Sequence, residues 1–318
     1  MSTTKSPLRL LVVAYGVGRR ALRRYWHVHA PKKFTLPQLF ACLVLKEFLR
    51  LDYRKLSALL EDAPNLVAAI GLKSVPHFTT FHKAAQRLLM ARHARRLLDE
   101  TVSTAKATGL LRPRVALAAL DGTGFETRHI SAYFVKRRAR ACKTGYETTT
   151  YTRYPYAELA CDCRTHLVLA VVTGRGPGPD LPYFRPALRQ TLRRTPVRTV
   201  LADAGFDCEW AHEFARNQCG VRAIIPPTRG RPSSKPPGGY WRNRMWRRFP
   251  KRQYGQRWQS ETVISMVKRL LDAALRARFY CSQSREIILR VLALNLMILR
   301  RITVFYRAGR NYFFGSCP

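Results

Sequence analysis

Apolar residues in the first third of the chain recur every three or four positions, the spacing of amphipathic helices. Three stretches carry the pattern: residues 36–48, about 53–60 and about 80–98. Thr35 and Gln38 form a capping box in front of the first stretch. We therefore expect a small helical domain over residues 34–108, preceded by a basic arm over residues 1–33.

From residue 115 the pattern changes to short apolar runs of strand length, separated by Gly, Pro and Asp. The expected strands are residues 115–120, 156–162, 166–172, 197–202 and 221–225. Helical patterns are expected at about 180–194, 209–217, 256–276 and 284–306. This order predicts an α/β domain over residues 109–306, with a mixed sheet flanked by helices, and a tail over residues 307–318.

The charge of the chain is strongly unbalanced, with 57 Lys and Arg against 19 Asp and Glu and a formal net charge of +38. A compact protein of this charge repels itself unless a polyanion neutralises it, so we expect a nucleic-acid partner. The hydrophobic fraction of 47% excludes a disordered basic tail protein. Because its last helix is rich in Lys and Arg, the helical domain is expected to bind DNA; a bundle with solvated basic faces is the alternative.

Membrane and zinc-ribbon classes are excluded by two further observations. The longest apolar stretch, residues 287–299, is interrupted by Arg290 and Asn295 and is too short to span a bilayer. The eight cysteines contain no C-x2-C pair, which argues against a zinc ribbon and against a disulfide framework. We therefore expect a cytoplasmic protein.

Two aspartates each follow an apolar strand and precede glycines: Asp121 in Asp121-Gly-Thr-Gly124, and Asp203 in Asp203-Ala-Gly205. Ligands bind at the carboxyl ends of strands in open α/β sheets. Two carboxylates there need cations between them, as in a two-metal site that holds Mg²⁺. An aspartate before a glycine is also ordinary turn chemistry, and that alternative stays open for both residues. Asp180, at the start of an expected helix, is expected to cap it.

A third acid, Glu261, shares an expected helix with three other functional side chains. Tyr254, Arg257, Glu261 and Lys268 stand at offsets of 0, 3, 7 and 14 residues. At about 100° per residue they fall on one face of the helix, opposite an apolar stripe. A carboxylate in such basic surroundings can complete a metal site while its neighbours hold phosphates. The alternative is an exposed helix with an ordinary Arg257–Glu261 ion pair.

Residues 226–253 contain no acid and are rich in Pro, Gly and Arg. We expect a flexible basic loop that contacts DNA phosphates and becomes ordered on DNA, with a solvated linker as the alternative. Its candidate contacts are Arg247, Arg248, Lys251 and Arg252. Trp258, together with Trp241 and Trp246, is a candidate for stacking on a displaced base, and core packing is the alternative for each.

The spacing Y-x2-R-x3-E-x6-K resembles the C-terminal signature of bacterial insertion-sequence DDE transposases, of the type of insertion sequences 4 and 5. The sequences Ala202-Asp-Ala-Gly-Phe-Asp207 and Asp121-Gly-Thr-Gly124 are similar to the two aspartate motifs of this family. Residues 34–60 and 75–82 are similar to its helical domain. The resemblance thus covers about residues 34–305.

The resemblance implies an RNase H-like fold and a transposase that binds the terminal inverted repeats of an insertion sequence. Asp121, Asp203 and Glu261 would be the catalytic and metal-binding triad, holding two Mg²⁺ ions for which Mn²⁺ substitutes. Tyr254, Arg257 and Lys268 would hold phosphates near the scissile bond.

The implied partners are double-stranded DNA, at the element ends and the target site, and a second copy of the chain in an active homodimer. The implied location is the bacterial cytoplasm, at the nucleoid and away from membranes. Two other hypotheses stay open. One is a catalytically silent DNA-binding remnant or repressor derived from a transposase, and the other is a basic RNA-binding protein.

Overall fold

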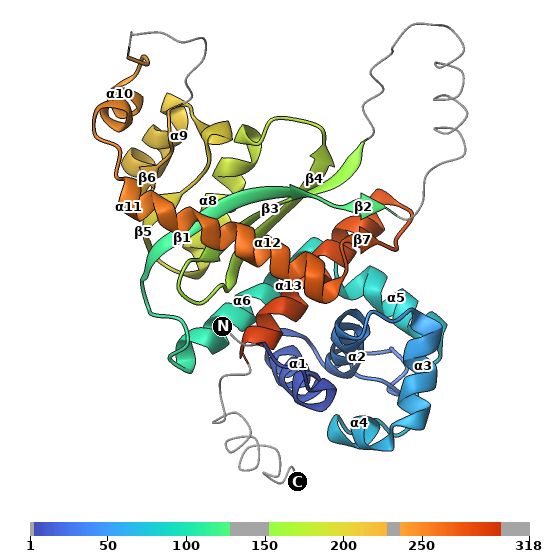
Figure 1. Cartoon of the computed structure of the whole chain (residues 1–318). Coiled ribbons are helices and arrows are strands. Elements are labelled where there is room, and N and C mark those ends of the chain that lie inside the picture. The colour runs from blue at the N-terminus through green and yellow to red at the C-terminus, as the bar shows by residue number, and fades with distance from the viewer. Residues whose placement is uncertain (1–2, 128–152, 228–235, 300–318) are drawn as a thin grey trace, which may run out of the picture.

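The computed structural model describes residues 3–127, 153–227 and 236–299. A group of helices leads into a mixed sheet that carries further helices (Figure 1). The first helices are α1 (Pro7–Ala21), α2 (Leu36–Phe48), α3 (Tyr53–Asp62), α4 (Pro64–Ala69), α5 (Phe78–Leu88) and α6 (Ala91–Ala107). The later helices are α8 (Leu181–Arg194), α9 (Glu209–Glu213), α10 (Tyr240–Arg247), α11 (Lys251–Tyr254), α12 (Trp258–Leu271) and α13 (Tyr280–Leu299).

Helix α2 begins where the capping box predicts. The N–H of Gln38 donates to Thr35 Oγ1 and the N–H of Thr35 donates to Gln38 Oε1. The helix is buried on all sides from Leu36 to Glu47 rather than along one stripe. The reason is that α1, α5 and α13 all pack against it. Helix α2 is therefore the core of the helical region.

Helix α1 occupies part of the expected basic arm. Its residues Leu10, Leu11, Ala14 and Val17 are buried, and the helix packs against α2 and α6. These apolar positions recur at helical spacing, so burial of one face stabilises the helix despite its basic residues. Residues 7–21 are thus a packed helix and not an arm, whereas the proposed domain boundaries remain predictions.

The helical pattern near residues 80–98 is divided between two helices. Helix α5 ends at Leu88, and Met90 adopts an extended backbone before α6 begins at Ala91. No glycine or proline marks this break, so local sequence signals could not predict it. Helix α4 was not predicted either.

The central sheet has the strand order β4-β3-β1-β5-β6. Its strands are β1 (Val115–Gly124), β3 (Tyr154–Asp162), β4 (Val168–Gly176), β5 (Val197–Leu201) and β6 (Arg222–Ile224). Strand β3 runs antiparallel to β1 and β4, whereas β5 and β6 run parallel to β1. This confirms the predicted mixed sheet flanked by helices and is consistent with the RNase H-like fold. The short strands β2 (Glu126–Thr127) and β7 (Ala274–Leu275) pair separately and were not predicted.

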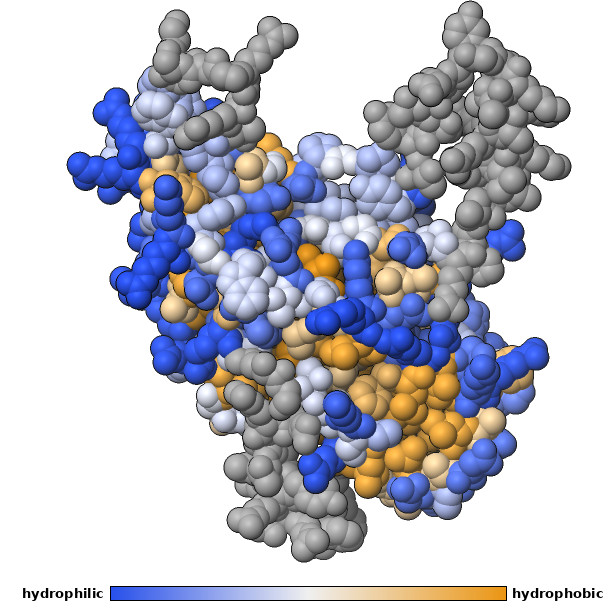
Figure 2. All heavy atoms as spheres, in the orientation of Figure 1, coloured by the Kyte–Doolittle hydropathy of each residue, from blue (hydrophilic) through white to orange (hydrophobic). Residues whose placement is uncertain are grey.

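Helix α12 packs on β1 and β3, and α8 packs on β3 and β4. Figure 1 shows α12 crossing β1 on one face of the sheet. In the same orientation, Figure 2 shows mainly hydrophilic residues over α10 to α12 and the largest hydrophobic patch over the helical region. No helix among the described residues is long and apolar enough to cross a membrane. Residues 300–306 of the last expected helix and the expected tail lie outside the described residues.

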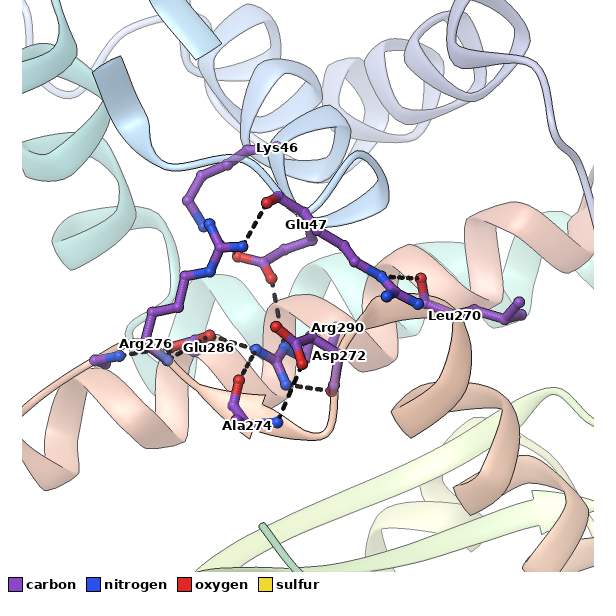
Figure 3. Close-up of polar contacts among 10 residues, drawn as sticks. Lys46, Glu47, Leu270, Asp272, Ala274, Arg276, Glu286 and Arg290 are labelled. Atoms are coloured by element: carbon purple, nitrogen blue, oxygen red, sulfur yellow. Dashed lines mark hydrogen bonds and ion pairs between the residues drawn. The ribbon is translucent and has the colours of Figure 1, made fainter. Parts of the chain in front are cut away.

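A buried ionic network joins α2 to α13 and to the end of α12 (Figure 3). Arg290 is 1% exposed and donates to the carbonyl of Asp272 at 2.6 Å, directly after α12. The same guanidinium pairs with Glu286 at 2.6 Å and with Glu47 at 3.5 Å, and Glu47 also pairs with Lys46 at 2.5 Å. Two acids and two bases balance each other in this Arg290 network. It ties the helical region to the segment that carries Glu261.

Candidate active site

Asp121 lies on β1, and Asp203 follows β5, the parallel neighbour of β1. The pairing of β1 with β5 sets Ala119 opposite Leu201, and each aspartate follows two residues later. The same register therefore puts the two carboxylates at one level and on one face of the sheet. Strand β1 continues beyond this point to Gly124, paired with β3. Asp121 thus lies within β1, where its neighbour β5 ends, and not at the end of its own strand as expected.

The glycine after Asp121 serves close packing rather than a turn. A Cβ at Gly122 would lie 1.7 Å from the Tyr156 hydroxyl oxygen, so only glycine leaves room for this tyrosine. The turn interpretation is therefore wrong for Asp121. At Asp203 a turn contact is present: Oδ1 accepts a hydrogen bond of 2.9 Å from the N–H of Gly205 at the start of a short 3₁₀ turn.

Arg257 connects two of the three candidate acids. It lies in the 3₁₀ turn that leads into α12. One nitrogen, Nη1, is 3.4 Å from Asp121 Oδ2, and Nη2 donates to Glu261 Oε1 at 2.5 Å. Ser260 Oγ lies 3.3 Å from the same Asp121 oxygen. The Arg257–Glu261 pair is therefore not an isolated surface pair, because it reaches across to the sheet.

The three acids differ in exposure and share one electrostatic environment. The Asp121 side chain is 15% exposed and that of Glu261 is 58% exposed. Burial raises the pKa of Asp121, the Arg257 guanidinium acts against this, and the charges of Asp203 and Glu261 raise the pKa further. Burial raises the pKa of the Tyr254 phenol, and Asp203 and Asp121 add to the rise. These side chains therefore interact electrostatically, although they come from three separate segments.

Lys268 stands apart from this group. Its Nζ lies 5.6 Å from the centre of the Phe125 ring, beyond the end of β1. Burial lowers the pKa of Lys268. Three of the four signature residues thus gather near Asp121, and the fourth lies farther along α12.

The carboxylates are the oxygen donors that Mg²⁺ prefers. Among the described residues, however, no three His, Cys, Asp or Glu side chains stand close enough to hold a metal ion. The guanidinium of Arg257 contacts both Asp121 and Glu261 and supplies the cation that the two charges need. The three carboxylates are thus suitable ligands for a divalent ion, and in this structure the positive charge between Asp121 and Glu261 is that of Arg257.

Three polar residues that the sequence analysis did not predict as a cluster lie on the opposite face of the sheet. Successive residues of a strand point to opposite faces, so the side of Gly122 that meets Tyr156 is the side away from the Asp121 carboxylate. Tyr156 Oη is 2.9 Å from Glu158 Oε2 and 2.7 Å from Asp180 Oδ1. Asp180 makes no side-chain cap to α8. The expectation of a helix cap is wrong, because this carboxylate contacts Tyr156 instead.

The two contacts of Tyr156 require a further proton. One hydroxyl can donate to only one carboxylate, so either Glu158 or Asp180 must donate to the tyrosine oxygen. Glu158 is fully buried and burial raises its pKa well above the ordinary value. We therefore assign the proton to Glu158, with Tyr156 donating to Asp180. An acid in the middle of an apolar strand was the sequence signal that could have identified this group.

Part of the expected flexible loop is helical. Helix α10 begins at the carboxylate of Glu209, which accepts from the N–H groups of Trp241 and Arg242 at 2.8 and 3.1 Å. Arg242 also donates twice to Asp207, at 2.9 and 2.7 Å. These two acids precede the loop in the sequence and hold α10 in place, so the expectation of flexibility is wrong there. Residues 228–235 of the loop lie outside the described residues.

The candidate DNA contacts of this segment are on the surface. Arg247, Arg248, Lys251 and Arg252 are all exposed. Trp258 is 54% exposed and Trp246 is also exposed, which leaves their rings open to a ligand. The ring of Trp241 is covered by the guanidinium of Arg216, 4.3 Å from its centre, in agreement with the packing alternative.

Comparison with protein families identifies the family of the chain. A family model of the transposase DDE domain matches residues 116–296, which is more than half of the chain. The matched part runs from β1 into α13 and contains Asp121, Asp203 and Glu261. No curated protein matches the chain. The chain therefore belongs to the family of transposases that carry a DDE domain.

Proposed function

We propose that this protein binds the terminal inverted repeats of an insertion sequence of the type 4 or 5 group and catalyses DNA cleavage and strand transfer. The observation that carries the proposal is the strand register that sets Asp121 beside Asp203, with Arg257 linking Asp121 to Glu261. Three acids from separate segments, in a chain with only 19 acids, are thereby in mutual electrostatic contact.

Asp121, Asp203 and Glu261 are the residues proposed to hold metal. Transposases of this family generally use divalent metal ions. Two Mg²⁺ ions, for which Mn²⁺ substitutes, would activate a water or a DNA 3′-OH for in-line attack on a phosphodiester. Basic side chains of the protein would orient the DNA, since one guanidinium group can donate two parallel hydrogen bonds to a phosphate. Arg257, Tyr254 and Lys268 are proposed to hold the phosphates around the scissile bond.

The exposed basic residues on and after α10 are proposed to bind the DNA backbone. Binding through phosphates explains the net charge of +38. The helical region is proposed to contact the repeats, and a homodimer is proposed to bring two element ends together. Trp258, exposed beside the triad, is proposed to stack on a displaced base.

The test is cleavage of a DNA that carries the element ends. Asp121→Asn, Asp203→Asn and Glu261→Gln should each lower the rate of strand nicking by a factor on the order of 10³ or more. DNA binding should survive in all three variants. Glu213→Gln, an exposed acid on α9, is the matched control and should cut normally. If all three variants still cut, the triad is misassigned.

A wild-type protein that binds the ends but never nicks them with Mg²⁺ or Mn²⁺ would instead support the silent repressor. Preference for RNA over DNA in competition would support an RNA-binding protein. Both alternatives are separable from a transposase in the same set of binding and nicking assays.

A further inference from the structure

The position of Arg257 has a consequence for the metal site. Its guanidinium touches Asp121 on strand β1 and Glu261 on helix α12, at 3.4 and 2.5 Å. A single cation therefore bridges two of the three acids that are proposed to hold a metal. Among the described residues, no three His, Cys, Asp or Glu side chains form a group that could hold an ion in this arrangement.

This bridge is more than an ordinary pair within one helix. A pair four residues apart on an exposed helix contributes a few tenths of a kcal/mol and needs no other partner. Here the guanidinium is four-fifths buried and reaches an acid that is itself largely buried. The carboxylates of Asp121 and Glu261 both stabilise its charge, and its hydrogen bond to Glu261 links α12 to the sheet through Asp121.

We propose that Arg257 is a resident counter-ion of the triad, which a divalent metal must displace from between Asp121 and Glu261 before it can bind. The proposal rests on the proposed function of these acids. Once displaced, the guanidinium is free to bind a DNA phosphate, to which its planar donors are suited. Metal binding and DNA binding then favour each other. A metal ion releases Arg257 to bind a phosphate, and a phosphate that binds Arg257 draws it away from the acids that hold the metal.

Two quantitative consequences follow. Removal of one nearby positive charge should tighten the binding of a divalent ion on the order of tenfold, even with solvent-like screening. DNA should also tighten metal binding to the wild-type protein, and by linkage the metal should tighten DNA binding by the same factor. Both effects should be smaller when Arg257 is absent, because only the direct attraction between the DNA phosphates and the metal ion then remains.

The experiment measures Mn²⁺ binding to the full chain by the loss of the free-ion electron paramagnetic resonance signal. The variants are Arg257→Ala and Arg257→Gln, which keeps a hydrogen-bonding amide if the alanine variant does not fold. Arg269→Ala is the matched control, because it removes an exposed charge from the same helix. The double variant Asp121→Asn/Asp203→Asn identifies the Mn²⁺ that binds at the triad.

We expect tighter Mn²⁺ binding in both Arg257 variants, wild-type affinity in Arg269→Ala, and a larger DNA-induced increase where Arg257 is present than where it is absent. The inference is overturned if the Arg257 variants bind Mn²⁺ no more tightly than Arg269→Ala. It is overturned together with the proposed site if Mn²⁺ binding is unchanged in the double aspartate variant. If the expected affinities are found but the wild type cuts no DNA, the inference stands and the proposed function fails.

Discussion

Replacement of Arg290 by methionine is expected to lower the free energy of unfolding by about 3–5 kcal/mol, the usual cost of breaking a buried ion pair from one side. The side chain is almost fully buried and has four hydrogen-bonding contacts. Without it, Lys46 alone would face two buried acids, Glu47 and Glu286. The variant also removes the hydrogen bond from Arg290 to the carbonyl oxygen of Asp272. Asp272 has a φ of 89°, a backbone conformation that is strained for any residue except glycine.

Urea unfolding followed by circular dichroism measures this cost. Arg285→Met, on the same helix and only partly buried, is the matched control and should cost less than about 1 kcal/mol. The double variant Arg290→Met/Glu286→Gln removes the excess negative charge. It should therefore be more stable than Arg290→Met alone, and a cycle that also includes Glu286→Gln alone gives the coupling between the two residues.

A loss below about 1 kcal/mol in Arg290→Met would refute the reasoning, because an uncompensated buried acid cannot be that inexpensive. Equal losses in the single and double variants would refute the assignment of the cost to charge. The network would then serve packing alone, and the connection between α2 and the end of α12 would not depend on it.

Three further predictions concern other parts of the molecule. Gly122→Ala should cost about 1–3 kcal/mol, because the new methyl displaces the Tyr156 hydroxyl from its two partners; Tyr156→Phe should recover part of this in thermal unfolding, and no recovery would contradict the steric cause. Burial raises the pKa of Glu158. The contribution of this group to the free energy of unfolding is therefore fully present below the ordinary carboxyl pKa of 4.5 and is lost as the pH rises through the raised pKa. The advantage of Glu158→Gln in unfolding free energy should therefore grow with pH, and an advantage independent of pH would argue against a protonated Glu158. The affinity for DNA should fall steeply with salt concentration, and a slope of only one or two charges would exclude extensive backbone contact.

The sequence predicted the sheet and the acid motifs because both leave local signals. Short apolar runs end at Asp121 or Asp203, and the helical period places Glu261 on the face of α12 that turns toward Arg257 and the sheet. The five predicted strands of the central sheet, and the helices predicted between them, occur in the predicted order. What the pattern could not give was the length of β1, since the strand continues past Asp121 by pairing with β3.

Features that depend on contacts between distant segments were not predicted. The segment of helix α1 was predicted to be a basic arm, because its packing against α2 is not visible in the local sequence. Helix α10 reads as a loop because Glu209 and Asp207, which hold it, precede it by some 30 residues. The contact of Arg257 with Asp121 joins residues 136 positions apart, and no local rule indicates it.

An acid in an unusual place in the sequence can therefore stabilise the fold or serve a functional site, and the burial of its ion pair distinguishes the two roles. Glu47, Glu286 and Asp207 are each closed in by an arginine and have buried side chains, so their charges serve the fold. Asp121 and Glu261 also share an arginine, but the Glu261 side chain is 58% exposed, so this end of the ion pair is in contact with solvent. A buried ion pair resists exchange because separation leaves a charge without solvent. A pair that opens to solvent can exchange its cation, and this is the physical reason to look for the metal at Asp121 and Glu261.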